Sequence, residues 1–186
     1  WTLEWSQAIL SIEIPGPVRL LFLLVLALSV VLPLRTWVAE PITIASPSME
    51  PTLKVGTLLL LDKWTLARRG PRRGEIVSFL NPLGGEDLVK RVIAVSGETV
   101  ELRGKSVFID GRTLEEPYAV HSRPGERLEG DDLPPLVVPE GCYFVLGDNR
   151  DESKDSSVWK SSSGERIYFI REAALQGFVR RLPWAE

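Results

Sequence analysis

Cysteine and histidine are nearly absent from this sequence of 186 residues, which contains one of each. Because Cys142 stands alone, no disulfide can form within the chain and no cluster of thiolates can bind zinc. Cys142 precedes an apolar run, so we expect it to be a small core residue. His121 lies in a polar segment with proline and glycine, which predicts a surface position. The sequence therefore gives little support for a Ser-His-Asp triad, since its one histidine is expected at the surface.

The sequence also lacks an excess of positive charge, since its formal net charge is −3. We therefore expect no nucleic acid as a partner, and we interpret the four arginines of 68–73 as part of a solvated loop. The acidic loop 147–157 offers carboxylates for a cation. Its spacing does not match an EF-hand, and Arg150 and Lys154 interrupt it, so we expect no metal and no cofactor.

Residues 1–17 are predicted to form a separate N-terminal segment. The chain begins with Trp1 and not with Met, which is typical of a trimmed or processed end. Residues 1–14 predict a short amphipathic helix, which the run Pro15-Gly16-Pro17 would break.

A long apolar run follows. Residues 20–34 carry no charge, and their neighbours extend the run toward the roughly 20 residues that span a bilayer. A buried core helix would need a large protein to cover a segment that is apolar all round. A cleaved signal peptide would need a small residue where Trp37 stands. We predict an uncleaved membrane anchor over 18–37, whose orientation is not set by the balanced charges of Arg19 and Arg35.

Beyond Glu40 the pattern changes to that of short strands. Asp110-Gly111 is typical of a two-residue hairpin turn. The stretch 115–139 is rich in Glu, Asp, Pro and Gly, which indicates an excursion from the core, and no helical pattern recurs before about Glu172. We predict one mainly β domain over 40–186, with strands at 57–61, 75–80, 88–95, 99–102, 106–109 and 143–146.

Two serines stand where a strand is expected to stop. Ile42 and Ile44 belong to an alternating apolar run, and Ser46 and Ser48 follow it among prolines. Because proline restricts both itself and the residue before it, the segment predicts a rigid bend that displays Ser48. Such a bend suits a nucleophile, although an ordinary turn has the same composition.

Two adjacent cations, Lys90 and Arg91, interrupt an apolar strand. Alternation places them on opposite faces, where both are expected to be buried. Desolvation lowers the pKa of a buried lysine, so a neutral Lys90 amine can act as a base near neutral pH. Arg91 cannot lose its proton and needs a carboxylate partner. The alternative is an edge strand whose two cationic stems reach water.

Three stretches in this order, behind an anchor, closely resemble type I signal peptidases: 46–53 (SPSMEPTL), 90–97 (KRVIAVSG) and 147–156 (GDNRDESKDS). The resemblance runs from about Val18 to Asp155. It implies an antiparallel β catalytic domain of the signal peptidase and LexA-like kind, with a small variable β cap inserted within 103–139.

The resemblance also implies roles for individual residues. Ser48 would be the nucleophile and Lys90 the general base, while Ser46 would join the Ser48 N–H in an oxyanion hole. Ser153 would orient the lysine. The structural ion pair of the family falls on Arg91 and Asp148, and Ile42, Ile44 and Val89 would line shallow pockets that admit small side chains before the scissile bond.

The implied activity is that of a membrane-bound serine endopeptidase that removes signal peptides from exported preproteins. Its partners would be those preproteins and membrane lipid, and its oligomeric state stays open. The domain would lie on the extracytoplasmic side of a single-pass anchor, with a bacterial plasma membrane preferred over an organelle membrane.

One departure from the family pattern concerns Asp155. The family usually has an arginine two positions later, where this chain has Ser157. Lys154, Lys160, Arg166 or water is expected to take its place.

Two other functions compete with this interpretation. A LexA-like self-cleaving protein would need a DNA-binding helical domain and no membrane span. A catalytically silent, membrane-tethered β interaction module would not need Ser48, Lys90 and Ser153.

Overall fold

The computed structural model describes residues 16–182. The chain divides into two compact units, the first ending at Val38 and the second beginning at Ala39. Each unit is described by itself below.

The first unit contains the apolar helix α2 (Gly16–Pro33), which continues into a π-helical turn, η1 (Leu34–Val38). Pro17 is compatible with this start, because the first turn of a helix has no use for its missing N–H. The 23 residues of Gly16–Val38 have a mean hydropathy of 2.4, and none is buried. Among the described residues this is the one helix long and apolar enough to cross a membrane. The helix predicted over 1–14 lies outside the described residues.

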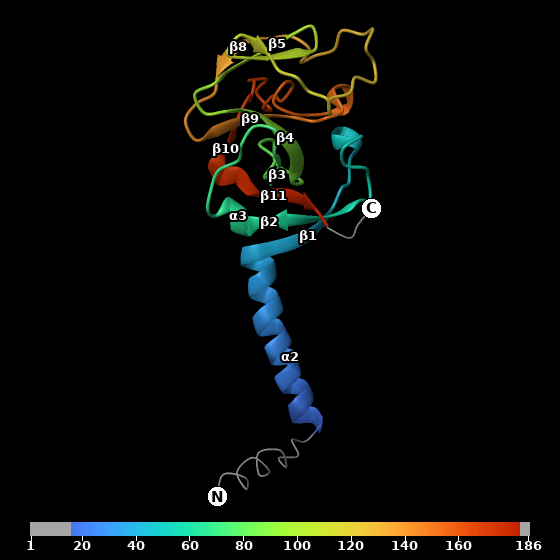
Figure 1. Ribbon diagram of the computed structural model, residues 1–186, viewed down its shortest axis with the longest axis vertical. Helices are drawn as coiled ribbons and strands as arrows, with labels where there is room; N and C mark the ends of the chain where they lie inside the picture. Colours follow the sequence, from blue (N-terminus) through green and yellow to red (C-terminus); the bar gives the residue numbers. More distant parts are fainter. Residues whose placement is uncertain (1–15, 183–186) are drawn as a thin grey trace, which may run out of the picture. The chain divides into compact units, whose positions relative to one another are not determined.

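The second unit is built on a seven-stranded antiparallel sheet (Figure 1). In spatial order the sheet consists of β1 (Ala39–Thr43), β2 (Leu58–Asp62), β11 (Leu175–Arg181), β3 (Ile76–Phe79), β4 (Leu88–Val95), β9 (Cys142–Leu146) and β10 (Ile170–Arg171). One helical turn, α3 (Lys63–Leu66), follows β2. The predicted strands agree with the observed ones within one residue at each end.

A second sheet has four strands: β7 (Arg112–Thr113), β6 (Ser106–Ile109), β5 (Thr99–Arg103) and β8 (Leu133–Val137). We call it the cap sheet. Three of its strands lie within 103–139, where a cap was predicted, whereas β5 begins before that range. Asp110 and Gly111 both have positive φ, and Ile109 pairs with Arg112, so the predicted hairpin turn is confirmed. Strand β8 lies inside the stretch interpreted as an excursion. Its two prolines hide the strand signal, and they are tolerated because β8 is at the edge of its sheet.

Strand β4 is the centre of the domain, because both of its faces are covered. Val92 belongs to one apolar cluster with Phe79 and Trp159, whereas Ile93 belongs to another with residues of the cap sheet. Since β4 pairs with β3 on one side and β9 on the other, the edge-strand alternative is wrong. Cys142 was expected to be a core residue. It is instead half-buried, at the border of the apolar cluster that contains Ile93.

The close approach of β11 to β2 at Gly177 generates a test. A Cβ at this position would lie 2.7 Å from Leu61 Cγ and 3.1 Å from the Asp62 carbonyl oxygen. Overpacking of this kind costs about 1–3 kcal/mol. We expect Gly177→Ala to lower the free energy of unfolding by about 2 kcal/mol in denaturant titrations. Gly125→Ala is the control, because a Cβ there meets nothing within 4 Å. Equal stability of the two variants would contradict the packing described.

Candidate active site

The serine bend predicted from the sequence is a 3-10 turn over Pro47–Met49, entered from an extended Ser46. Two apolar side chains hold this turn to the domain: Met49 and Leu53 are buried with β2 residues, and Leu53 N–H donates to the Met49 carbonyl at 2.8 Å. The turn therefore directs its one buried hydroxyl, that of Ser48, toward the sheet and not toward water.

Lys90 reaches Ser48 from the middle of β4. Its Nζ donates a hydrogen bond of 2.6 Å to Ser48 Oγ, and Ser46 Oγ lies 3.0 Å from the same atom. The Lys90 side chain is enclosed, with 2% of the residue exposed. Three hydroxyl and amine groups that were separate in the sequence thus form one connected cluster.

Burial lowers the pKa of Lys90 from 10.5 to about 8. Desolvation is the largest cause, since an ammonium loses hydration inside the domain, and the negative charges of Asp155 and Asp148 oppose it in part. A substantial fraction of the amine is therefore neutral slightly above neutral pH. This matches the requirement for a base that was predicted from the apolar neighbours of Lys90.

Arg91 meets its expected carboxylate on the opposite face of β4. Its guanidinium binds Asp148 through two hydrogen bonds, Nε to Oδ1 at 2.8 Å and Nη2 to Oδ2 at 2.6 Å. Nη1 donates to the Gly74 carbonyl, and the group stacks over the Tyr118 ring at 3.9 Å. Each of the three guanidinium nitrogens thus donates a hydrogen bond, which offsets the cost of removing this buried cation from water.

The loop after β9 packs directly beneath the serine bend. Asn149 N–H donates to the Ser48 carbonyl at 3.1 Å. Gly147 has no room for a side chain, since a Cβ would lie 2.3 Å from Ser153 Oγ and 2.5 Å from the Ser48 carbonyl oxygen. Ser153 is buried beside Gly147, and its Oγ has no hydrogen-bond partner among the described residues. The loop is a support for the site and not a surface loop.

Ser157 itself supplies what the missing arginine would give to Asp155. The buried Asp155 carboxylate accepts hydrogen bonds from Ser157 N–H (3.0 Å), Ser157 Oγ (2.7 Å) and Gly147 N–H (2.9 Å). Two of the expected cationic substitutes have other partners: Lys160 and Arg166 pair with Glu129, and Arg166 also donates to the Ser157 carbonyl at 2.7 Å. Short neutral donors are enough because the backbone of the loop turns back toward the carboxylate.

Two adjoining cavities lie beside the cluster. The smaller, of about 120 Å³, is lined by Ser46, Ser48, Lys90, Ile44 and Val89 among others. The larger, of about 280 Å³, contains Ile42 and shares Val89 with the first. Of the three predicted pocket residues, Ile44 and Val89 therefore lie at the serine and lysine, and Ile42 lies one cavity further along.

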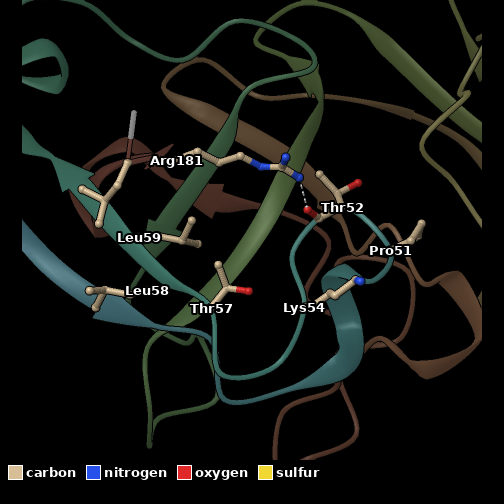
Figure 2. A pocket seen from close by; sticks show the side chains of 8 residues that line it. Pro51, Thr52, Lys54, Thr57, Leu58, Leu59 and Arg181 are labelled. Atoms are coloured by element: carbon tan, nitrogen blue, oxygen red, sulfur yellow. Dashed lines mark hydrogen bonds between the residues drawn. The ribbon is translucent and has the colours of Figure 1, made fainter. Parts of the chain in front are cut away.

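A third cavity, of about 280 Å³, lies beyond the serine bend and contains neither Ser48 nor Lys90 (Figure 2). Arg181 reaches across from β11 and donates to the Thr52 carbonyl at 2.5 Å, as Figure 2 shows. This contact ties the segment that follows Ser48 to the sheet.

A buried ion pair beneath the site was not found from the sequence. Glu116 and Arg150 are bonded through both carboxylate oxygens, each with 8% of its side chain exposed, and Arg150 Nε donates to the Gly147 carbonyl. The one local signal that could have indicated burial here is the aromatic Tyr118, two residues after Glu116 in the stretch 115–139. His121 lies beside Asp151, 3.4 Å away, and makes no contact with Ser48 or Lys90.

Within residues 16–182, no group of three or more His, Cys, Asp or Glu side chains converges to hold a metal ion.

Comparison with known proteins gives one consistent result. A family model described as signal peptidase, peptidase S26, matches residues 18–182. Signal peptidase I of Leptolyngbya laminosa is 42% identical over 144 residues, 72% of this chain and 68% of that protein. Signal peptidase I P of Bacillus subtilis subsp. natto is 32% identical over 158 residues, 83% and 77% of the two chains. A solved signal peptidase I from Enterococcus faecalis V583 is 32% identical, covers 59% of this chain and 97% of that one, and has a TM-score of 0.45.

The buried lysine makes stability depend on pH in a defined direction. Because the folded state releases the Lys90 proton near pH 8 and the unfolded chain keeps it to about 10.5, the unfolded state binds more protons in this window. The contribution of Lys90 to the free energy of unfolding of the wild type therefore rises between pH 8 and 10.5, by about 3 kcal/mol. We expect Lys90→Met to be more stable than the wild type at pH 7, with the difference shrinking by pH 10.

Thermal unfolding at the two pH values measures this difference. Lys54→Met is the matched control, because it removes an amine from the exposed end of the same bend. A constant difference between Lys90→Met and wild type from pH 7 to 10 would contradict the lowered pKa.

Proposed function

This chain belongs to the signal peptidase family, peptidase S26, and we propose that it removes signal peptides from exported preproteins with a Ser48 and Lys90 dyad. The observation that carries the proposal is the 2.6 Å hydrogen bond between Lys90 Nζ and Ser48 Oγ, in a place where burial holds the pKa of the amine near 8. A general base needs both hydrogen-bond reach and a pKa close to the working pH.

The reaction proceeds in two steps that use one amine. The neutral Lys90 amine accepts the Ser48 proton while Oγ attacks the peptide carbonyl carbon, and the resulting ammonium protonates the leaving nitrogen. The amine, neutral again, then removes a proton from water as the water oxygen attacks the ester carbon. It returns that proton to Ser48 Oγ as the ester bond breaks and the signal peptide is released. Histidine is not required at any step, and the hydrogen-bond partner of His121 is Asp151 and not Ser48 or Lys90.

Two further hydroxyls support these steps. Ser46 Oγ, 3.0 Å from Ser48 Oγ, is placed to donate to the oxyanion together with the Ser48 N–H. Ser153 is proposed to orient the amine. Its buried Oγ without a partner is costly in the resting protein, and a hydrogen bond to Lys90 during the reaction accounts for it.

The small cavity supports a preference for small side chains before the cleaved bond. With a volume of about 120 Å³, walled by the apolar Ile44 and Val89, it accepts a residue such as alanine. The catalytically silent module and the self-cleaving alternative are less well supported, because the dyad is assembled and no DNA-binding helical domain is found among the described residues.

Incubation of the detergent-solubilised protein with a secretory preprotein tests the activity. Ser48→Ala and Lys90→Met should abolish cleavage, because one lacks the nucleophile and the other the base. Ser46→Ala should lower kcat by about 10²- to 10³-fold, as expected for the loss of one oxyanion donor. Normal cleavage by Lys90→Met would contradict the dyad.

The pH dependence of kcat/KM tests the identity of the base. Since only the neutral amine accepts a proton, activity should rise with pH through a midpoint of about 8 and fall as the amine is protonated below it. His121→Ala should leave both rate and midpoint unchanged. If His121→Ala shifts the midpoint or abolishes cleavage, the histidine is the base and the proposal is wrong.

The length and composition of the helix Gly16–Val38 support a single-pass membrane anchor. We propose that it lies in a bacterial plasma membrane, in contact with lipid, with the domain from Ala39 on the extracytoplasmic side, to which preproteins are exported. Protease added to intact spheroplasts should then digest the domain, and carbonate washing should leave the chain in the membrane. Full protection of the domain would reverse the proposed orientation.

A further inference from the structure

The larger cavity next to the dyad has a polar pair in its wall. It shares Thr43, Asp87 and Val89 with the smaller cavity, so the two adjoin. Ser78 of β3 and Gln176 of β11 line it, and Ser78 Oγ donates to Gln176 Oε1 at 2.8 Å. Apolar side chains such as Ile42 and Leu61 make up other parts of the wall. A hydrogen-bonded pair in such a place needs a structural or a functional reason.

A β-bulge directs Gln176 to this position. Leu175 pairs with Phe79 and Gly177 pairs with Ser78, so β11 advances by two residues where β3 advances by one. Gln176 is the additional residue. Bulges beside functional sites redirect a side chain that regular alternation would send elsewhere. The neighbours Phe79 and Phe178 remain in the core on the other side of the sheet.

The amide of Gln176 keeps unused hydrogen-bonding capacity. The Ser78 hydroxyl donates to the amide oxygen, and the amide nitrogen makes no hydrogen bond with any residue of 16–182. An amide in a cavity that becomes covered by a ligand loses water and then requires a replacement partner. A hydroxyl can serve, because it both donates and accepts.

The charges around the cavity restrict its occupant further. Glu40 and Lys63 form an ion pair of 2.8 Å with each other, so their charges compensate. Asp87 stands where the two cavities meet and has no ion-pair partner among the described residues. An acidic side chain would be repelled by this carboxylate, which argues against an acidic occupant.

An extended peptide joins the two cavities. Its side chains alternate, so residues two apart point the same way about 7 Å from each other. With the residue before the cleaved bond in the small cavity, the residue two positions earlier enters the larger one. Resting on the proposed function, we infer that Gln176, positioned by Ser78, selects preproteins with a hydroxyl-bearing side chain, threonine above all, at this third residue before the cleaved bond.

Two precursors that differ only at this residue, threonine in one and valine in the other, test the inference. The two side chains have nearly the same shape and differ by the hydroxyl. We expect kcat/KM of the wild type to be about 2- to 10-fold higher for the threonine precursor, as one net hydrogen bond provides. In Gln176→Met the ratio should fall to about one, while the valine precursor is still cleaved, which shows that the variant is folded.

Ser78→Ala should lower the ratio in the same direction, because the amide loses its support. Ser122→Ala removes an exposed hydroxyl elsewhere and should leave the ratio as in the wild type. A wild-type ratio of one, or a ratio that survives Gln176→Met, would overturn the preference and leave the dyad proposal standing. Failure of the wild type to cleave either precursor would instead overturn the proposed function, and the preference with it.

Discussion

The desolvation of one amine is the constraint on which the rest of this domain depends. Lys90 can serve as a base only if its ammonium is made unfavourable, and this requires apolar residues on every side of β4. The same burial costs stability at neutral pH. The apolar clusters around the neighbouring strands and the cap sheet provide the burial that offsets this cost.

The two faces of β4 hold two adjacent cations in different electrostatic environments. On one face Lys90 is kept without a direct carboxylate partner, since Asp155 and Asp148 act on it only through space. On the other face Arg91 is fully paired with Asp148. If the two cations exchanged places, the base would be held charged and the arginine would stand unpaired at the nucleophile. Alternation along a strand therefore separates a reactive cation from a structural one by a single residue.

Much of this arrangement could be predicted from the sequence because it depends on local patterns. The proline-bounded bend at Ser48, the alternation around Lys90 and the Asp110-Gly111 turn each involve a few consecutive residues. Strand β8 could not be predicted, because Pro134 and Pro135 obscure its signal and only pairing with β5 makes it a strand. The Glu116 and Arg150 pair and the bulge at Gln176 depend on register between distant segments, which no local pattern records.

Strand β11 has a consequence for the order of assembly. It lies between β2 and β3, so the strand next to the serine bend and the strand that pairs with Lys90 are joined through residues 175–181. Ser48 and Lys90 are made early in synthesis, yet the sheet that holds them in register closes only when this much later strand inserts. Contacts of such long sequence separation form slowly. A nascent chain therefore carries Ser48 and Lys90 before the strand that completes their sheet has been made, and the two come into register only after the greater part of the domain has been synthesised.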